Sequence, residues 1–379
     1  MKLRIPLLVL ALSLVLLILF RLFPSFMDTI YSSFLYVVIA QGVSFITALI
    51  PFSLAEILIY LLFLIVVFFL VRGILLPAFK PFAEVKVIWK KNLHDAAYLA
   101  LWGTSFFLLG SGLHYHRLPL EDHLGYPQQQ VHPSDLVNLA EALAGEVNRA
   151  ASFTRRNAEG DMIPEHTFDR YKKDIALAYD SLAFTSGLRV GGWYPATKTV
   201  LASRGMSYAY VSGFFFPWTL EANVNKDVPV FSLPAVMTHE QAHARGFMRE
   251  NEANFLTYLI ARHTLSGDLK YSCLLHSLGY VLNAVYSTSP EEYFALLSGL
   301  SPRVLYDLKK KHAYWEQFSS SFGEISQKVN DAYLKANAQA GGVATYGKVV
   351  DLMVADFKIN KEQVQQNPER SVYIGEGTH

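Results

Sequence analysis

Three long apolar segments in the first third of the chain constrain its fold most strongly. Residues 5–20, 57–71 and 96–113 contain no charged side chain. Each is close to the ~20 residues that an α-helix needs to cross the hydrocarbon core of a bilayer. Only 17% of the whole chain is charged and 52% is hydrophobic, whereas soluble domains are roughly 25% charged. The sequence therefore predicts a helical anchor in contact with membrane lipid, with transmembrane helices at 5–23, 54–76 and 95–114.

A fourth apolar stretch, residues 32–50, is more polar than these three. It carries Gln41, Ser44 and Thr47, which suits an interfacial or re-entrant helix better than a span. Basic residues lie before the first span and again in residues 72–95, and such loops tend to stay in the cytoplasm. With three spans, both of these basic regions lie in the cytoplasm. We therefore expect a multi-pass protein of the cell membrane, with a cytoplasmic N-terminus, a membrane domain over 1–117 and the remainder outside the cytoplasm.

Residues 118–357 are enough for one domain with its own hydrophobic core. Residues 207–211 and 214–216 are rich in aromatic side chains and are predicted to form strands. The polar residues 358–379 are expected to be a disordered tail. The predicted fold class is a mainly helical α+β domain with a small sheet, because apolar residues recur at helical spacing over 134–147, 164–185, 249–263, 273–286, 290–299, 301–315, 317–337 and 345–357.

The pentapeptide His239-Glu240-Gln241-Ala242-His243 carries the clearest chemical signal. On a helix that begins after Ser232 and ends near Gly246, the two histidines lie on one face and can bind one metal ion. Glu240 lies about 100° around the helix from His239 and could act as a general base. This HExxH pattern is typical of zinc hydrolases, in which a third protein ligand completes the site. The residues around the motif are uncharged except Arg245, where an apolar residue would be expected.

The third ligand has to come from the residues after the motif. Metzincins place a histidine where this chain has Arg249, so that pattern fails. Gluzincins use a glutamate on the following helix, and an acid four residues later accepts a hydrogen bond from a ligating histidine. Glu250 and Asn254 match those two positions, with the Asn254 amide oxygen replacing the acid. Glu252 stays open as the alternative ligand.

These segments together resemble a bacterial family of membrane-anchored proteins that is catalogued as a domain of unknown function near the gluzincin metallopeptidases. The similarity includes residues 51–53, 115–120, 213–225, 239–247, 250–256 and 271–272. It implies a zinc peptidase without an assigned substrate. Resemblance to gluzincins also implies that the strand material at 208–216 pairs with extended substrate, although a role of these aromatics in the core is equally compatible with the sequence. An oxyanion stabiliser is implied too, with four candidates: His263, His276, Tyr271 and Tyr346.

The sequence therefore predicts a membrane-bound Zn²⁺-dependent endopeptidase that hydrolyses peptide bonds outside the cytoplasm. Its substrate is a protein or a cell-wall peptide. The alternative is a non-catalytic membrane sensor or assembly factor with a structural zinc ion, against which an intact Glu240 argues. The net charge of +1 and the absence of a basic cluster give no indication of a nucleic-acid partner.

Overall fold

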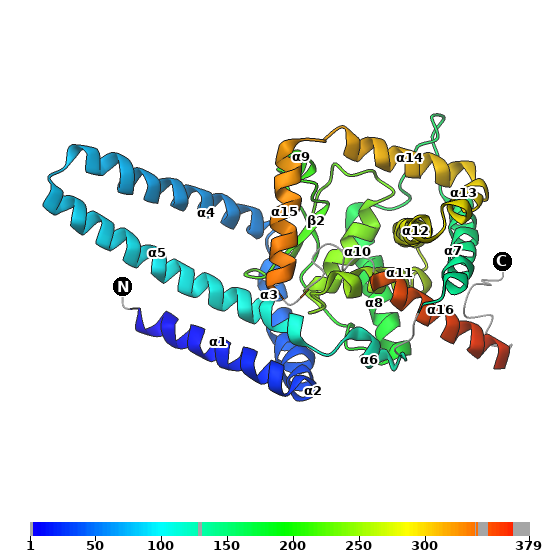
Figure 1. Cartoon of the computed structure of the whole chain (residues 1–379), viewed down its shortest axis with the longest axis horizontal. Helices are drawn as coiled ribbons and strands as arrows, with labels where there is room; N and C mark the ends of the chain where they lie inside the picture. Colours follow the sequence, from blue (N-terminus) through cyan, green and yellow to red (C-terminus); the bar gives the residue numbers. More distant parts are fainter. Residues whose placement is uncertain (1–2, 128–130, 338, 340–347, 367–379) are drawn as a thin grey trace.

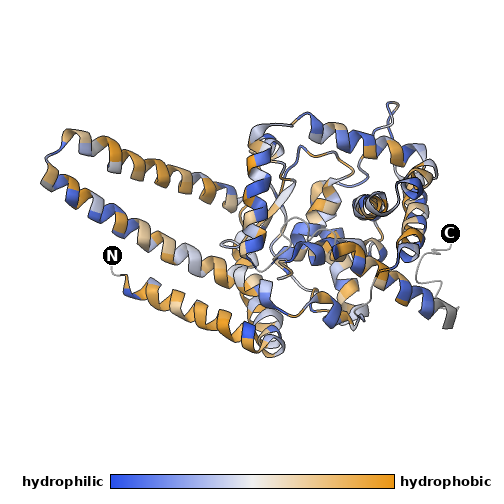
Figure 2. Cartoon of the chain, in the orientation of Figure 1, coloured by the Kyte–Doolittle hydropathy of each residue, from blue (hydrophilic) through white to orange (hydrophobic). Residues whose placement is uncertain are grey.

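The computed structural model describes residues 3–127, 131–337, 339 and 348–366. It is mostly helical, with a globular body from which long N-terminal helices project on one side (Figure 1). The projecting helices are α1 (Arg4–Leu22), α4 (Leu54–Leu70) and α5 (Phe82–Gly110). Helix α1 packs against α5, and α4 continues into a π-helical segment (Val71–Leu75) and a 3-10 helix (Leu76–Phe79) that lead into α5 at the far end. Helices α1 and α4 are apolar along almost their whole length (Figure 2).

Three of the described helical segments are long and apolar enough to cross a membrane. They are α1, the continuous run Pro24–Ala48, and Leu54–Phe79. Two of these match the predicted transmembrane helices, and the third lies in the stretch for which an interfacial or re-entrant helix was predicted. Helix α5 covers residues 95–110 of the predicted span 95–114 and is charged in its first half, at Glu84, Lys86, Lys90, Lys91 and Asp95. The last residues of that span lie in a 3-10 helix, Gly112–His116, whose first four residues are buried. The assignment of 95–114 as a span and the orientation of the helices in the membrane stay predictions.

The run Pro24–Ala48 lies where the projecting helices meet the body, and it runs transverse to α1, α4 and α5 (Figure 1). It comprises α2 (Pro24–Met27), a π-helical segment (Asp28–Leu35) and α3 (Tyr36–Ala48). One face is buried and partly polar, with Asp28, Ser32, Tyr36, Ala40, Ser44 and Thr47. Another face exposes large apolar side chains, including Phe34, Val38, Phe45 and Ile46. An amphipathic helix in this position is compatible with the predicted interfacial placement.

The sheet is small and mixed. Strands β1 (Lys198–Thr199), β2 (Gly213–Phe216) and β3 (Glu221–Val224) are arranged in the order β1-β3-β2, with β1 parallel and β2 antiparallel to β3. The prediction of a strand at 207–211 is wrong. Helix α9 (Ser203–Tyr208) occupies the start of that region, and Tyr210 follows with a left-handed φ of 57°. The cause is tertiary, because the buried hydroxyl of Ser207 bonds within α9 and accepts a hydrogen bond from Asn225 next to β3.

The body helices surround one hydrophobic core and follow the predicted ranges closely, although α12 begins six residues earlier than predicted, after the Ser266 cap. The disordered tail predicted for 358–379 is wrong for residues 358–366, because α16 continues to Gln366 and Lys358 pairs with Asp135 on α7. Residues 367–379 lie outside the described part of the chain. The helices are α6 (Leu120–Leu124), α7 (Pro133–Phe153), α8 (Phe168–Ser186), α10 (Leu233–Ala244), α11 (Glu250–His263), α12 (Gly267–Thr288), α13 (Pro290–Ser298), α14 (Pro302–Glu316), α15 (Ser321–Ala336) and α16 (Lys348–Gln366).

Candidate metal centre

Helix α10 carries the HExxH motif through the middle of the body. It begins after Ser232 with Pro234 in its first turn, where the missing N–H of proline costs nothing. It ends before Gly246, which has a φ of +83° that glycine adopts without strain. A Cβ at Gly246 would also lie 3.0 Å from the His114 ring. Both predicted ends of the helix are confirmed.

The unexpected charge at Arg245 is stabilised by aromatic rings and carbonyl groups. Its guanidinium lies 4.0 Å from the ring centre of Tyr179 and 4.5 Å from that of Tyr194. Its Nε donates to the Val190 carbonyl at 2.6 Å, and its Nη1 donates to the side chain of Gln241 at 2.5 Å. Gln241 in turn donates to the Pro195 carbonyl at 2.7 Å. Arg245 therefore connects α10 to α8 and to the loop at 190–195, a role that local sequence does not reveal.

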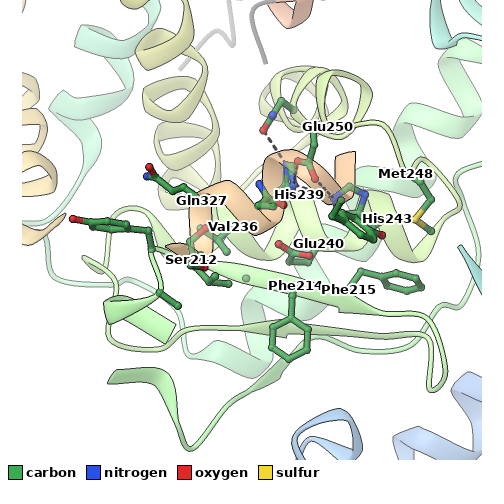
Figure 3. Close-up of a pocket in the computed structure, with 18 of the residues that line it drawn as sticks. Ser212, Phe214, Phe215, Val236, His239, Glu240, His243, Met248, Glu250 and Gln327 are labelled. Carbon is green, nitrogen blue, oxygen red and sulfur yellow. Dashed lines mark hydrogen bonds and ion pairs between the residues drawn. The ribbon is translucent and has the colours of Figure 1, made fainter. Parts of the chain in front are cut away.

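His239, His243 and Glu250 converge on one point (Figure 3). The two Nε2 atoms are 3.1 Å apart, and they lie 3.2 Å (His239) and 3.7 Å (His243) from the Glu250 carboxylate oxygens. Ligand atoms around a tetrahedral zinc ion, with bonds of about 2.0–2.1 Å, are about 3.3 Å apart. The three donors thus have the spacing and the chemistry to hold a divalent metal ion.

The remaining ring nitrogens hold both histidines in the orientation that this requires. Nδ1 of His239 lies 2.9 Å from the Asn254 side-chain oxygen, and Nδ1 of His243 lies 2.7 Å from the Phe247 carbonyl. An N–H on each Nδ1 makes Nε2, the nitrogen that faces Glu250, the one available to a metal ion. Asn254 lies where the sequence predicted it, one helical turn after Glu250 on α11.

Glu252 occupies a different environment from Glu250. It is buried, and its Oε1 accepts hydrogen bonds from the Leu120 backbone N–H at 3.0 Å and from Arg249 at 2.7 Å. Arg249 also donates to the carbonyls of Tyr115 and Arg117. Of the two candidate third ligands, the geometry favours Glu250, while Glu252 and Arg249 attach α11 to the segment that follows α5.

Glu240 lies beside the three donors, between α10 and strand β2 (Figure 3). Gly213 approaches it so closely that a Cβ there would be 2.6 Å from its Oε1. Burial raises the pKa of Glu240 to about 8. A carboxyl with a pKa near neutrality is suited to accept and return a proton at physiological pH.

The two histidines have opposite electrostatic environments. Burial alone would lower the pKa of His239, but the adjacent Glu250 carboxylate raises it to about 9. Burial lowers the pKa of His243 to about 4. A metal ion at this point would therefore replace a proton on His239 and meet a neutral His243.

A cleft of about 480 Å³ opens over these residues. Its walls come from the end of α5, strand β2, helices α10 to α12, and α15. Among the described strands, β2 lies at the edge of the sheet with β3 on one side only, and Gly213, Phe214 and Phe215 line the cleft. The sequence predicted strand material beside the site at residues 208–216. The structure has an edge strand there at 213–216 only.

The structure separates the four candidates for oxyanion stabilisation. His276 lines the cleft, but its Nε2 contacts Asn254 at 2.9 Å. His263 lies in a separate cavity beside Ser181, and Tyr271 is buried and bonded to Asp307. Tyr346 lies outside the described residues.

Four tyrosines line the cleft. Tyr210 lies in the aromatic segment for which strands were predicted, whereas Tyr115, Tyr280 and Tyr333 were not predicted to lie at the site. The hydroxyls of Tyr115 and Tyr333 are 3.1 Å apart, and these residues come from segments 218 positions apart. Only Tyr280 had a signal in the sequence, since it lies one helical turn after His276 on α12.

The sequence matches a known protein family. A family described as a protein of unknown function (DUF3810) matches residues 31–354. The chain belongs to this family. The match extends from the run Pro24–Ala48 through the motif helix to α16. No curated protein and no solved structure matches the chain.

Proposed function

We propose that this DUF3810 protein is a membrane-bound zinc metallopeptidase of gluzincin type, acting on peptide bonds outside the cytoplasm. The observation that carries the proposal is the convergence of His239, His243 and Glu250 within 4.8 Å of one another, next to a buried Glu240 in an open cleft. Within the described residues this cluster offers three ligands, which suits a catalytic site better than a closed structural one.

The donor set fits zinc, because two imidazole nitrogens and one carboxylate oxygen are its common catalytic ligands. When bound, zinc would supply Lewis-acid polarisation of a carbonyl group and activation of water. Glu240 would accept the proton of the attacking water and pass it to the leaving amine. Tyr115, Tyr280 and Tyr333 line the same cleft and provide hydroxyl groups for the developing oxyanion.

Strand β2 would position the peptide. Its outer edge has no strand partner among the described residues, three of its residues line the cleft, and an extended peptide can add to such an edge through backbone hydrogen bonds. Gly213 brings the start of the strand against Glu240, so a peptide paired with β2 would pass the general base. This arrangement links substrate binding to the proposed chemistry through one short strand.

The test is a Glu240→Gln variant of the full-length protein, purified in detergent and compared with the wild type for zinc content and hydrolysis of a broad peptide library. We expect unchanged zinc content and a rate lower by about 10²–10⁴-fold, the usual contribution of a general base. Glu159→Gln, the same substitution at an exposed loop position, serves as the control. Retained turnover in Glu240→Gln would refute the mechanism. Bound zinc with no cleavage by the wild type would favour the non-catalytic sensor.

A further inference from the structure

Strand β2, which borders the cleft, leads into a turn that contacts helix α5. Immediately after β2, the chain turns at Pro217 and Trp218 and contacts two glycines on α5. A Cβ at Gly110 would collide with the Pro217 carbonyl oxygen, and one at Gly103 would lie 3.2 Å from the Trp218 ring. The two glycines are seven residues apart and therefore lie on the same face of the helix. A peptide that extends along β2 is thereby directed at the uncharged half of α5, where the predicted span 95–114 lies.

Helix α15, which also lines the cleft, lies at the same boundary. It runs across the direction of α4 and α5 at the point where they enter the body (Figure 1). Tyr333 on α15 has its ring 6.2 Å from that of Phe107 on α5, and its hydroxyl contacts Tyr115. Ser326 and Asn330 face the cleft from the same helix.

Helix α15 also carries an apolar stripe that the body leaves uncovered. Phe322, Ile325 and Val329 are 59%, 57% and 64% exposed. At about 100° per residue, these three fall within about 60° of one another, on the side that includes Tyr333. The charged residues are centred roughly opposite Tyr333, at Glu324, Lys328, Asp331 and Lys335. The apolar stripe is therefore on the side of α15 nearest the anchor, as expected for a helix that lies in a membrane surface.

We propose that the apolar stripe of α15 lies in the lipid surface, and that the cleft takes an extended juxtamembrane segment of another membrane-anchored protein. The proposal rests on the proposed peptidase function and adds the class of substrate. Lipid is the occupant that the arrangement favours, because the stripe lies on the side of α15 that carries Tyr333, whose ring packs against Phe107 near the end of α5. The cleft then opens at the water–lipid boundary, between a strand that leads to α5 and a helix that lies on the membrane.

The first experiment measures the contact between α15 and lipid without any assay of activity. Val329→Cys and the control Glu324→Cys, on the same helix but another face, are labelled with an environment-sensitive fluorophore in the full-length protein. The only native cysteine, Cys273, is fully buried. In phosphatidylcholine–phosphatidylglycerol vesicles with nitroxide lipids, we expect quenching at 329 to be several-fold stronger than at 324. Equal quenching would overturn the proposal. So would protection of position 329 from both nitroxide lipids and aqueous iodide, which would indicate a covering protein.

The second experiment tests the class of substrate. A peptide library is fused to a transmembrane helix in the same vesicles, either directly or behind a flexible Gly/Ser linker of about 30 residues. The library is also offered without a tether. We expect at least tenfold faster cleavage of the directly fused library. An Ile325→Lys/Val329→Lys variant should lose that advantage, whereas the control Glu324→Lys should keep it.

Equal cleavage with and without the linker would overturn the substrate proposal and leave the peptidase function intact. If zinc-loaded wild type cleaves none of the three libraries, the peptidase function fails and the substrate proposal fails with it. The quenching result is independent of both outcomes, so the three failures are distinguishable.

Discussion

The contact between Gly213 and Glu240 gives the sharpest test of the site. Gly213 does not have a positive φ, so its backbone conformation accepts alanine. The added Cβ, however, would lie 2.6 Å from Oε1 and 2.8 Å from Cγ of Glu240. To restore ordinary contact distances, the carboxylate or the strand has to move by about 0.8 Å. A shift of about 1 Å in a reacting group costs roughly 10²-fold in rate, or about 2.7 kcal/mol.

The assay for Gly213→Ala combines kinetics with metal analysis on the full-length protein. We expect kcat to fall roughly 10²-fold, while zinc content stays at the wild-type level because the substitution touches none of the three proposed ligands. Gly205→Ala is the matched control, since a Cβ at Gly205 meets no atom within 4 Å. Wild-type kcat in Gly213→Ala would refute the argument that this strand positions the general base. Loss of zinc in parallel with activity would refute it too.

Three further predictions concern other residues. Glu250→Gln should lower zinc affinity at least tenfold, measured by metal titration. Glu252→Gln should keep zinc but lose about 1–3 kcal/mol of stability, measured by thermal unfolding, because Glu252 is a buried acceptor for Arg249. Arg245→Met should lower the free energy of unfolding by about 3 kcal/mol, measured by denaturant titration, through loss of its charged hydrogen bonds and ring contacts. Glu146→Gln should raise the Tm at pH 7, because burial raises the pKa of Glu146 and the folded protein therefore favours its neutral form.

The sign of the Glu146 effect defines its pH range. A carboxyl with a raised pKa adds stability below its ordinary value of 4.5, and that contribution is lost as the pH rises through the pKa of the folded state. The gain in Tm from Glu146→Gln should therefore disappear at about pH 4. A gain that persists at this pH would contradict the assignment to burial. For Glu250 and Glu252, equal loss of zinc in both variants would contradict the distinction drawn from their contacts.

Local patterns were sufficient for most helices and for the core of the site. Ser232, Pro234 and Gly246 are local signals for the ends of α10: Ser232 immediately precedes the helix, Pro234 is in its first turn, and Gly246 has the positive φ of a helix end. The spacing of His239 and His243 places both rings on one face of that helix. Asn254 was predicted from the gluzincin pattern, in which a side chain four residues after the glutamate ligand accepts a hydrogen bond from a ligating histidine, and the structure places it 2.9 Å from His239.

Contacts between distant segments were beyond such patterns. Aromatic content suggested a strand at 207–211, but hydrogen bonds of the Ser207 hydroxyl accompany a helix there. Helix α16 extends past the predicted end, where Lys358 reaches Asp135 on α7. Tyr115, Tyr280 and Tyr333 of the cleft come from the segment after α5, from α12 and from α15, whose proximity is a property of the folded chain. Glu250 and Glu252 differ only in which neighbours the fold brings to them.

The sequence by itself determined that the chain has apolar helices suited to a membrane, and that one helix presents two histidines on one face. Both follow from composition and periodicity, which act through the nearest turns of the backbone. Tertiary structure decided how these parts combine. It placed Glu250 beside the histidines, Gly213 against Glu240, and the turn after β2 on Gly103 and Gly110 of α5. These contacts join residues far apart in the chain, so they depend on packing, which no local pattern encodes.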